Sequence, residues 1–503
     1  MSSAPGEPPT VALDGVVVRY PTGTIALDGA RFTLERGSIR GLVGENGAGK
    51  STLLGALCGF VPVVAGTLAI GGMSEPAFAT RSWTPRRAIA RGLGMVHQHF
   101  SLVDALSVCD NVALGRAPRW CGAFYDRRRA RDEVRELSTR YGLAVDPDAP
   151  VHALSLGERQ RVEILKALAK GATALVLDEP TAVLAPPEVR SLFAVLRELA
   201  RGGCAIAITT HKLGEVAELC DAVTVLRAGR VAGELPMARA TPAEIARLMM
   251  GKDPEPVPPR APARRGQRAL QVAGLAVDGD QGEHAVRDCS LELFAGEILG
   301  IAGVLGNGQR ELVEALAGLR PTRAGAITLP PGGTIAFVHE DRARHGLVGA
   351  MSVAENLVLG RHHESTFSGR WGVLRRGAIH REAVRLVALH DVRPPDPEAP
   401  AATLSGGNQQ KLVLARELAR GTSALVAAQP TRGVDLGATR AIRDELVRAR
   451  DRGVAILLVS AELDFVLELA DRVCVLYRGR VVLEQTADAL DRDAIGRAMA
   501  GVA

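Results

Sequence analysis

Short apolar runs alternate along the chain with stretches whose apolar residues recur at helical spacing. Runs with the length of buried strands are residues 39–43, interrupted only by Arg40 and Gly41, and residues 174–177 and 205–208. Between the first two, Val162, Leu165 and Leu168 recur at a spacing of three, which is typical of a helix with one buried face. Strands that alternate with helices predict a largely parallel sheet covered by helices, so we expect an α/β fold.

The pattern occurs twice in the chain. Residues 159–181 (RQRVEILKALAKGATALVLDEPT) match residues 409–431 (QQKLVLARELARGTSALVAAQPT) at an offset of 250. An internal match of this kind indicates a duplication. We therefore predict two related domains, residues 1–250 and 269–503. Residues 251–268 are rich in Pro and Arg, which indicates an exposed linker between them.

Composition narrows the class of protein. A chain of 503 residues with 47% hydrophobic residues is long enough for two cores. The net charge of +5 is a mild excess and aromatic residues make up 3%, so no nucleic-acid partner is expected. The seven cysteines include no Cys-x-x-Cys pair, which indicates reduced cytosolic thiols. No uncharged apolar stretch reaches the roughly 18 residues of a membrane span, and the N-terminus does not resemble a signal peptide, so we expect neither a membrane span nor export.

Residues 44–51 (GENGAGKS) form a complete phosphate-binding loop. The loop lies between the strand predicted at 39–43 and a helical stretch at 52–57, which is the context that the motif requires. Its glycines let backbone N–H groups turn toward phosphates, Lys50 neutralises phosphate charge, and Ser51 can bind Mg²⁺. The alternative is a glycine-rich turn that only caps a helix. The nucleotide-binding residues expected here are Gly44, Glu45, Asn46, Gly47, Ala48, Gly49, Lys50, Ser51 and Thr52.

Two carboxylates follow the strand predicted at 174–177. Asp178 suits Mg²⁺ coordination through water, and Glu179 suits polarising the attacking water. The alternative is that the acidic pair only forms a turn. This alternative is less favoured because the pair follows an apolar strand. Upstream, Ser155 and Glu158 have the spacing of a capping box at the start of a helix.

The order of these motifs resembles that of ATP-binding cassette (ABC) proteins. The matching motifs are the phosphate loop, Gln98 in residues 95–98 (MVHQ), the pentapeptide 154–158 (LSLGE), residues 177–180 (LDEP) and His211 in residues 209–211 (TTH). The resemblance covers nearly the whole chain, twice. It implies two nucleotide-binding domains in tandem, each with a mainly parallel sheet, an antiparallel β part and a helical subdomain. It also implies ATP and Mg²⁺ as ligands.

The resemblance assigns roles to single residues. Tyr20 would stack on adenine, and His211 would contact the γ-phosphate. Glu179 would be the catalytic base. Gln98 would sense the metal and couple the site to a transmembrane partner. The Mg²⁺ ligands that the resemblance implies are Ser51, Gln98 and Asp178.

The second half resembles a cassette that has lost its chemistry. Its copy of the phosphate loop, residues 303–310 (GVLGNGQR), is damaged. The replacements are Gln309 and Arg310 for Lys50 and Ser51, Gly279 for Tyr20, Glu340 for Gln98, Ala428 and Gln429 for Asp178 and Glu179, and Ala461 for His211. Yet residues 404–408 (LSGGN) are an intact pentapeptide, whereas the first half has Leu156 in place of its central glycine.

In ABC proteins two cassettes close head to tail, so each ATP lies between one phosphate loop and the other cassette's pentapeptide. The resemblance therefore implies one complete site, in which the first phosphate loop faces Ser405, Gly406 and Gly407. The other pairing, of Gln309 with Leu156, would lack its lysine, metal ligands and base, so we predict no hydrolysis there. The halves would pair with each other or with those of another copy.

The tandem layout and residues 430–435 (PTRGVD) resemble the ATPases of bacterial sugar and nucleoside importers. Residues 427–430 (AAQP) and 303–309 (GVLGNGQ) are similar to the nucleoside branch, which implies two transmembrane permease subunits and an extracytoplasmic solute-binding lipoprotein. Glu340 in place of Gln98 would suit two different permeases. The chain would then act at the cytoplasmic face of the bacterial inner membrane.

Three alternatives stay open. The first is a monosaccharide importer ATPase of the ribose or galactose type. The second is a soluble, non-transport ABC protein that acts on ribosomes or DNA, although the Pro-rich linker and the lack of zinc-binding cysteine clusters argue against it. The third is a catalytically silent scaffold, which conflicts with the intact first phosphate loop.

Overall fold

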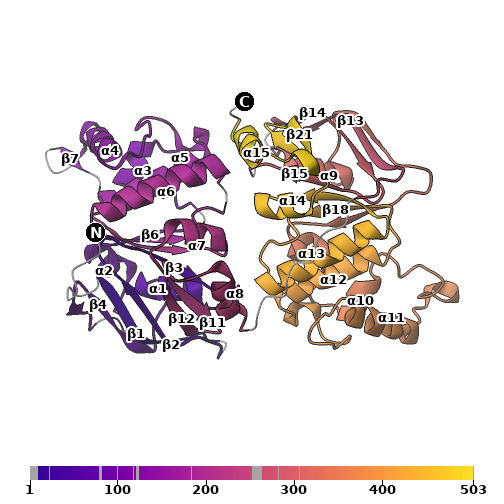
Figure 1. Ribbon diagram of the computed structural model, residues 1–503, viewed down its shortest axis with the longest axis horizontal. Coiled ribbons are helices and arrows are strands. Elements are labelled where there is room, and N and C mark those ends of the chain that lie inside the picture. The colour runs from indigo at the N-terminus through magenta and orange to yellow at the C-terminus, as the bar shows by residue number, and fades with distance from the viewer. Residues whose placement is uncertain are drawn as a thin grey trace. The chain divides into compact units, whose positions relative to one another are not determined.

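The computed structural model describes most of the chain. The described residues are 10–21, 23–76, 78, 82–98, 100–116, 118–120, 124–182, 184–251, 263–280, 282–304 and 306–501. The chain forms two compact units, Met1–Pro256 and Val257–Ala503, called here the first and the second unit (Figure 1). The linker predicted at 251–268 lies mostly outside the described residues, and the predicted domain boundaries stay a prediction.

The first unit contains a six-stranded sheet of order β12-β11-β3-β10-β9-β6, in which only β11 and β12 are antiparallel. An antiparallel sheet has the order β2-β1-β4-β5, and β7 and β8 form a hairpin. The strands are β1 (Val11–Arg19), β2 (Ile25–Leu34), β3 (Ile39–Val43), β4 (Ala65–Ile70), β5 (Met73–Ser74), β6 (Leu93–Val96), β7 (Arg119–Trp120), β8 (Phe124–Tyr125), β9 (Ala174–Asp178), β10 (Ala205–Thr209), β11 (Ala222–Arg227) and β12 (Arg230–Pro236). The helices are α1 (Lys50–Leu57), α2 (Pro85–Ala90), α3 (Val108–Ala113), α4 (Arg127–Tyr141), η1 (Val151–Ala153), α5 (Leu156–Ala169), α6 (Pro186–Arg201), α7 (Leu213–Leu219) and α8 (Pro242–Met250).

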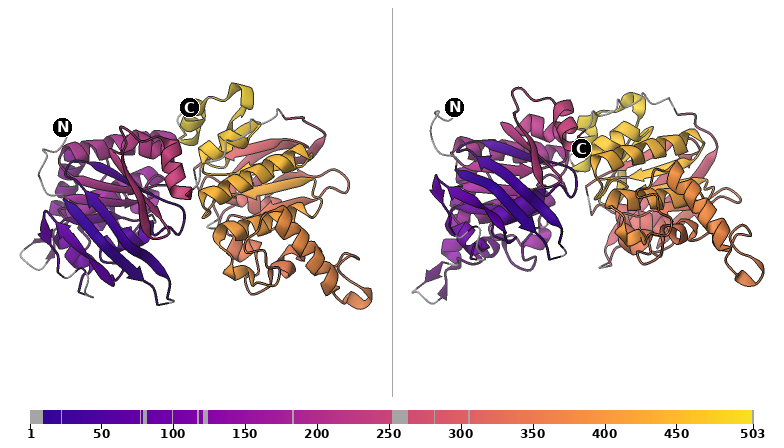
Figure 2. Two further views of the ribbon diagram at one scale, coloured as in Figure 1. Left: turned by 60° about the horizontal axis from the view of Figure 1, so that its bottom comes forward. Right: turned by 90° about the horizontal axis from the view of Figure 1, so that it is seen from below.

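The second unit repeats this plan. Its six-stranded sheet has the order β17-β18-β19-β15-β20-β21, and its antiparallel sheet has the order β14-β13-β16. The strands are β13 (Arg268–Asp278), β14 (His284–Phe294), β15 (Ile298–Ala302), β16 (Ala324–Thr328), β17 (Ile335–Val338), β18 (Ala424–Ala428), β19 (Ala455–Val459), β20 (Arg472–Tyr477) and β21 (Arg480–Thr486). The helical elements are α9 (Gln309–Leu316), the π turn η2 (Arg342–Gly346), α10 (Val353–Val358), η3 (Arg370–Gly372), α11 (Arg376–Leu389), η4 (Ala401–Thr403), α12 (Gly406–Leu418), α13 (Leu436–Asp451), α14 (Leu463–Leu469), η5 (Ala487–Ala489) and α15 (Arg492–Met499). The segment around α11 projects from the rest of this unit (Figure 2).

The α/β fold predicted from the hydrophobic pattern is confirmed in both units. The apolar runs predicted as strands are β3, β9 and β10, and every residue of these strands is buried. Their side chains alternate between two cores. Leu175 and Leu177 of β9 pack with α5 and α6, whereas Val176 packs with α1 and the antiparallel sheet. Because both faces of the parallel sheet are covered, its strands are mostly apolar at every position rather than alternating, with the buried Arg40 of β3 as an exception.

The units differ in what precedes β6 and β17. In the first unit residues 71–92, between β4 and β6, contain β5 and α2. In the second unit only residues 329–334 separate β16 from β17, and no helix is described there. The second unit therefore lacks the wall that α2 forms beside the first sheet.

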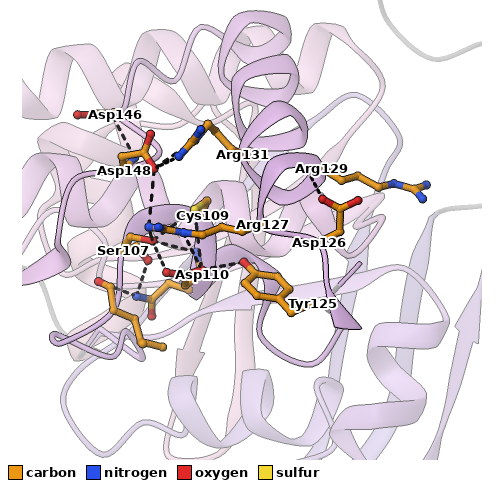
Figure 3. Close-up of polar contacts among 12 residues, drawn as sticks. Ser107, Cys109, Asp110, Tyr125, Asp126, Arg127, Arg129, Arg131, Asp146 and Asp148 are labelled. Atoms are coloured by element: carbon orange, nitrogen blue, oxygen red, sulfur yellow. Dashed lines mark hydrogen bonds and ion pairs between the residues drawn. The ribbon is translucent and has the colours of Figure 1, made fainter. Parts of the chain in front are cut away.

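A polar network joins the β7–β8 hairpin to the helical part of the first unit (Figure 3). Ser107 caps α3, and Asp110 in the first turn accepts a hydrogen bond of 2.8 Å from the Tyr125 hydroxyl. The Arg127 side chain lies 3.6 Å from Asp110 and 3.7 Å from Asp148. Burial and then the hydrogen bond to Asp110 raise the pKa of Tyr125, so the hydroxyl stays protonated as a donor.

Two global expectations can be compared with the structure. None of the described helices has both the length and the apolar character needed to cross a membrane. Among the described residues, Cys58, Cys109, Cys204, Cys220, Cys289 and Cys474 are free thiols. The remaining cysteine, Cys121, lies outside the described residues.

Candidate functional site

The phosphate loop of the first unit connects the buried end of β3 to the first residue of α1. Two of its glycines leave no room for a side chain. A Cβ on Gly44 would lie 2.3 Å from the carbonyl oxygen of Leu226, and one on Gly49, whose φ is 105°, would lie 2.7 Å from that of Ala26. The loop is therefore pressed against neighbouring backbone, which holds its N–H groups in place for a ligand.

Gly44→Ala should consequently destabilise the first unit. Relieving a 2.3 Å contact with a backbone oxygen requires the loop to move, and overpacking of this kind costs about 1–3 kcal/mol. In a unit of this size we expect the melting temperature to fall by several degrees, about 2–4 °C per kcal/mol. The matched control is Gly214→Ala in α7, where nothing lies within 4 Å of the added Cβ. Equal melting temperatures for the two variants would show that the loop can accommodate a side chain at Gly44.

Lys50 is held over the loop by hydrogen bonds to the backbone of the loop. Its Nζ donates hydrogen bonds to the carbonyl oxygens of Gly44 (2.7 Å) and Glu45 (3.0 Å), and the residue is 7% exposed. Burial lowers the pKa of Lys50, although the negative charges of Glu179 and Asp178 act in the opposite direction. The ammonium group is thus positioned at the loop, where a phosphate could replace the two carbonyl partners.

The two predicted carboxylates lie at the carboxyl end of β9. Asp178 is the last residue of the strand, and its Oδ1 accepts a 2.6 Å hydrogen bond from the hydroxyl of Thr209 on β10. The same hydroxyl accepts a 2.8 Å hydrogen bond from the backbone N–H of Glu179. Thr209 therefore fixes both acidic residues, a role that sequence reasoning missed. The role follows from the register of the parallel pair β9–β10, in which Thr209 lies opposite Asp178, and the sequence does not indicate this register.

Glu179 adopts a backbone conformation that is unfavourable for a side chain. Its φ is 46°, in the left-handed region, where strain of about 1–3 kcal/mol is common at functional sites. Gln429, at the corresponding position of the second unit, has a φ of 47°. The turn that presents this residue is therefore the same in both units, and only its chemistry differs.

Gln98 and His211 converge on Glu179. The Nε2 of Gln98 donates a 3.2 Å hydrogen bond to one carboxylate oxygen, and the Nδ1 of His211 lies 3.4 Å from the other. The hydrogen bond with His211 lowers the pKa of Glu179 against the effect of burial, with further help from the charges of His211, Lys50 and Lys212. The carboxylate is therefore ionised at neutral pH and can accept a proton. The three residues predicted to be catalytic do lie together.

His211→Ala is expected to move the acidic limb of the pH–rate profile for ATP hydrolysis to higher pH. A base acts in its ionised form, so the rate falls as the pH drops through its pKa. Without His211 the strongest influence that lowers the pKa of Glu179 is lost, and burial raises it. The pH dependence of kcat/KM between about pH 5 and 8 locates the acidic limb even when the maximal rate is reduced as well. His152→Ala is the control, because His152 contacts Asp104 and not Glu179. A limb that stays in place would show that His211 does not tune Glu179.

Tyr20 lies beside the start of α1, as its predicted contact with a nucleotide requires. Its hydroxyl is 3.2 Å from the Oγ1 of Thr52, and its side chain is exposed. Ser51, in the first turn of the same helix, is also exposed. The structure therefore places the aromatic ring, the serine hydroxyl and the phosphate loop at one end of a single helix.

Each pentapeptide begins a helix. Ser155 caps α5 in a capping box with Glu158, which confirms the predicted structural role. Ser405 caps α12, where its hydroxyl accepts a 2.9 Å hydrogen bond from the side chain of Asn408. A Cβ on Gly406 would lie 2.6 Å from Arg342. Ser405 is exposed and Gly406 partly so, and both are thus accessible on the surface of the second unit.

The degenerate loop of the second unit is filled by its own glutamine. Gln309 is 6% exposed, and its Nε2 donates a 3.0 Å hydrogen bond to the carbonyl oxygen of Val304, as Lys50 does to Glu45. Unlike a lysine, it also has an acceptor. Its Oε1 accepts a 3.1 Å hydrogen bond from the backbone N–H of Asn307, inside the loop. One side chain therefore satisfies both a carbonyl and an N–H that a phosphate loop would turn to its ligand.

The neighbouring positions are closed by ion pairs. Arg310 pairs with Asp280 and, at 3.1 Å, with Glu314. Arg320 pairs with the same two carboxylates at 2.6 and 2.7 Å. Asp280 follows Gly279, which replaces the adenine-stacking tyrosine. The network thus joins the segment where adenine would lie to the helix that follows the loop.

The remaining replacements also have partners inside the second unit. The Oε1 of Gln429 accepts a 3.1 Å hydrogen bond from the backbone N–H of Ala461, the residue in place of His211. Glu340, in place of Gln98, lies 3.5 Å from Arg432. None of the groups that converge on Glu179 in the first unit is reproduced at these positions of the second unit. The geometry supports nucleotide chemistry in the first unit alone.

The phosphate loop, the carboxylate pair and the repeated α/β fold define the class of protein: the chain belongs to the ABC transporter family, whose family model matches residues 27–182 and 286–432. As a member of this family it binds and hydrolyses ATP. It is 40% identical over 491 residues to the guanosine import ATP-binding protein NupO of Bacillus subtilis, with 95% of each chain covered. It is 38% identical over 489 residues to the nucleoside import ATP-binding protein NupA of Lactococcus lactis, again with 95% of each chain covered.

Other relatives are sugar import ATP-binding proteins, and some solved structures match nearly the whole chain. The chain is 39% identical over 506 residues to the ribose import ATP-binding protein RbsA 1 of Rubrobacter xylanophilus, with 98% of each chain covered. The crystal structure of an archaeal ribosome recycling factor, in complex with a ribosomal stalk protein, matches 97% of this chain and 92% of its own with a TM-score of 0.62. Its 19% identity means that this likeness shows the fold alone.

Proposed function

We propose that the chain is the ATP-hydrolysing subunit of a bacterial nucleoside importer and drives transport through separate transmembrane subunits. The observation that carries the proposal is the 40% identity to a guanosine import ATP-binding protein over 95% of both chains, together with the converging groups of the first unit. The second candidate is a ribose-type importer, which the 39% identity to a ribose import ATP-binding protein favours. The two candidates share the chemistry and differ in the solute.

The chemistry would take place in the first unit. Lys50 and the N–H groups of the phosphate loop would bind the β- and γ-phosphates of ATP. Glu179 would accept the proton of the attacking water, because it is ionised and lies in reach of Gln98 and His211. His211 would contact the γ-phosphate. Thr209 would keep the carboxylates of residues 178 and 179 in position.

The donors of the first unit fit a magnesium ion. Mg²⁺ prefers oxygen ligands, and Ser51, Asp178 and Gln98 supply a hydroxyl, a carboxylate and an amide oxygen. Gln98 uses its Nε2 for Glu179, so its oxygen can face a metal. When bound there, Mg²⁺ would neutralise charge on the phosphate oxygens.

The site would be completed by a pentapeptide from a second unit. Following the head-to-tail closure of ABC proteins, Ser405, Gly406 and Gly407 would contact the nucleotide bound by the first unit. The second unit would come from the same chain or from another copy. ATP would then stabilise a closed pair of cassettes, and loss of the γ-phosphate would release it.

The transport partners would be two permease subunits in the bacterial inner membrane, with the chain bound peripherally at the cytoplasmic face. Gln98 and Glu340 differ, so the surfaces around them would suit two different permeases. A solute-binding lipoprotein outside the membrane would deliver the nucleoside. The chain itself would not contact the solute.

Uptake of labelled solutes tests the proposal. Cells that lack the chain are compared with cells that carry the wild type, using guanosine, adenosine, ribose and galactose. We expect nucleoside uptake to fall without the chain and to return with the wild type. Loss of ribose or galactose uptake instead would move the assignment to the second candidate, and no loss of any solute would contradict a role in import.

A further inference from the structure

Each unit has a cavity at the end of the strand that leads to Gln98 or Glu340. His97 follows β6 and lines the first cavity, and His339 follows β17 and lines the second. Both cavities are also lined by two basic residues, four positions apart, at the end of the helix that begins at the pentapeptide. These are Lys166 of α5 with Lys170 just after it, and Arg416 of α12 with Arg420 two residues past its end. The repeat therefore places the two cavities at equivalent positions.

The first cavity is largely apolar. It measures about 200 Å³, and α2 supplies one wall through Ile89, beside the exposed ring of Phe60. One of the two lysines in its lining is paired within the unit. Lys166 donates a 2.6 Å hydrogen bond to the carbonyl oxygen of Ser101 and lies 3.8 Å from Glu163. A partner that enters this cavity would meet mainly carbon atoms.

The second cavity is cationic. It measures about 330 Å³, and residues of the π turn η2 form part of its lining. Its charged lining is Arg344, Arg416 and Arg420 against the one carboxylate of Glu417. Glu417 is already shared, since it accepts hydrogen bonds from Arg416 (2.7 Å) and from Arg420 (3.1 Å). The three arginines in the lining therefore exceed its one carboxylate by two positive charges.

One donor in this wall has no acceptor. Arg416 is 6% exposed, and its Nη1 is buried without a hydrogen-bond partner. An unsatisfied group of this kind costs free energy, and more so when it is charged. Arg344 also lines the cavity and is exposed, and it makes no ion pair within 4 Å in the part of the chain that the structure describes. Guanidinium groups bind carboxylates strongly and in fixed geometry, so the exposed guanidinium groups of Arg344 and Arg420 fit an anionic partner.

The surroundings favour an acidic side chain on a peptide over a free ion. The cavity is also lined by Leu347 and Val348, and Val348 is 40% exposed. Met351, three residues after Val348 in the sequence, is 38% exposed. Apolar residues beside exposed arginines match a segment that presents one carboxylate among apolar residues. A small anion would bury none of this apolar surface.

We propose that the second cavity receives an acidic side chain of the transmembrane subunit that docks on the second unit, whereas the first cavity receives an apolar one. This inference rests on the proposed function, because the transmembrane subunits are themselves part of that proposal. It makes the two docking surfaces chemically different. Each permease subunit would then fit one unit only, and the importer would assemble in a single orientation.

Zero-length cross-linking tests the contact directly. The full chain carrying Arg344→Lys is purified with its transmembrane subunits and treated with a carbodiimide, which joins an amine to a carboxylate only when the two touch. We expect a cross-link between position 344 and an Asp or Glu of one transmembrane subunit, identified by mass spectrometry. Lys170 of the first cavity is the internal control and should form no cross-link to a transmembrane subunit. Cross-links from Lys170 alone would overturn the proposal.

Charge reversal provides the second measurement. Arg344→Glu with Arg420→Glu should reduce recovery of the transmembrane subunits on a tagged chain by at least about tenfold, since a docked carboxylate would be repelled. Lys170→Glu, the matched variant in the first unit, should not. ATP hydrolysis by the isolated chain reports that each variant is folded. Unchanged recovery with Arg344→Glu and Arg420→Glu would overturn the inference.

Two further outcomes separate the possible failures. If the wild-type chain recovers no membrane protein at all, the proposed function itself fails. If sodium phosphate raises the melting temperature of the isolated wild-type chain but not of the Arg344→Glu, Arg420→Glu variant, the cavity binds a free anion, and the docking proposal is overturned.

Discussion

Replacing Glu179 with Gln is expected to lower ATP hydrolysis by about 10²- to 10⁴-fold, the range for loss of a general base. The amide is nearly the same size but cannot accept the proton of the attacking water. ATP should still bind, because Lys50 and the phosphate loop are untouched. Phosphate release measures the rate, and binding of a fluorescent ATP analogue measures the affinity.

The second unit offers a matched control for this variant. Gln429 occupies the same strained turn, with a φ of 47° against 46° for Glu179. Gln429→Ala removes a side chain whose Oε1 contacts only the backbone of its own unit in the described structure, so the hydrolysis rate should stay near that of the wild type. A loss as large as that of Glu179→Gln would mean that the second unit also takes part in the chemistry.

Replacing Lys50 with Ala should weaken ATP binding by about 10- to 100-fold. A hydrogen bond to a charged group contributes about 1.5–3 kcal/mol, and Lys50 already points its ammonium group at the loop. Hydrolysis should fall further, because the developing charge on the phosphate oxygens loses its cation. Titration with ATP followed by single-turnover hydrolysis separates the two effects.

Gln309→Ala is the corresponding control in the second unit. Gln309 fills its own loop through Val304 and Asn307, so its loss should leave ATP affinity and hydrolysis unchanged. A drop in either would show that nucleotide does reach the degenerate loop. In that case the two units would contribute to binding more equally than their geometry indicates.

Much of this site can be predicted from the sequence, because its motifs are local. The phosphate loop and the carboxylate pair are contiguous residues that follow apolar strands, and parallel strands bring their carboxyl ends to one edge of the sheet. Thr209 escaped prediction for the opposite reason. Its role depends on its register opposite Asp178, and a threonine at the end of a strand has no signal of its own.

The second unit shows more clearly what cannot be predicted from the sequence. The sequence indicates that Gln309 and Arg310 have lost the chemistry of lysine and serine, and this interpretation agrees with the geometry. It does not indicate that the loop is filled. That result needs the contact of Gln309 with a backbone N–H two residues away and the ion pair of Arg310 with Asp280, 30 residues upstream. The cationic cavity likewise depends on charges that the fold brings together, Arg344 of η2 with Arg416 and Arg420 at the end of α12.

The number of ATP molecules that the Glu179→Gln variant retains per chain, counted after rapid removal of free nucleotide, shows directly whether the chain has one working nucleotide site. We expect one ATP per chain, and none once Lys50→Ala is added. Two ATP molecules per chain, or one that survives Lys50→Ala, would contradict this expectation.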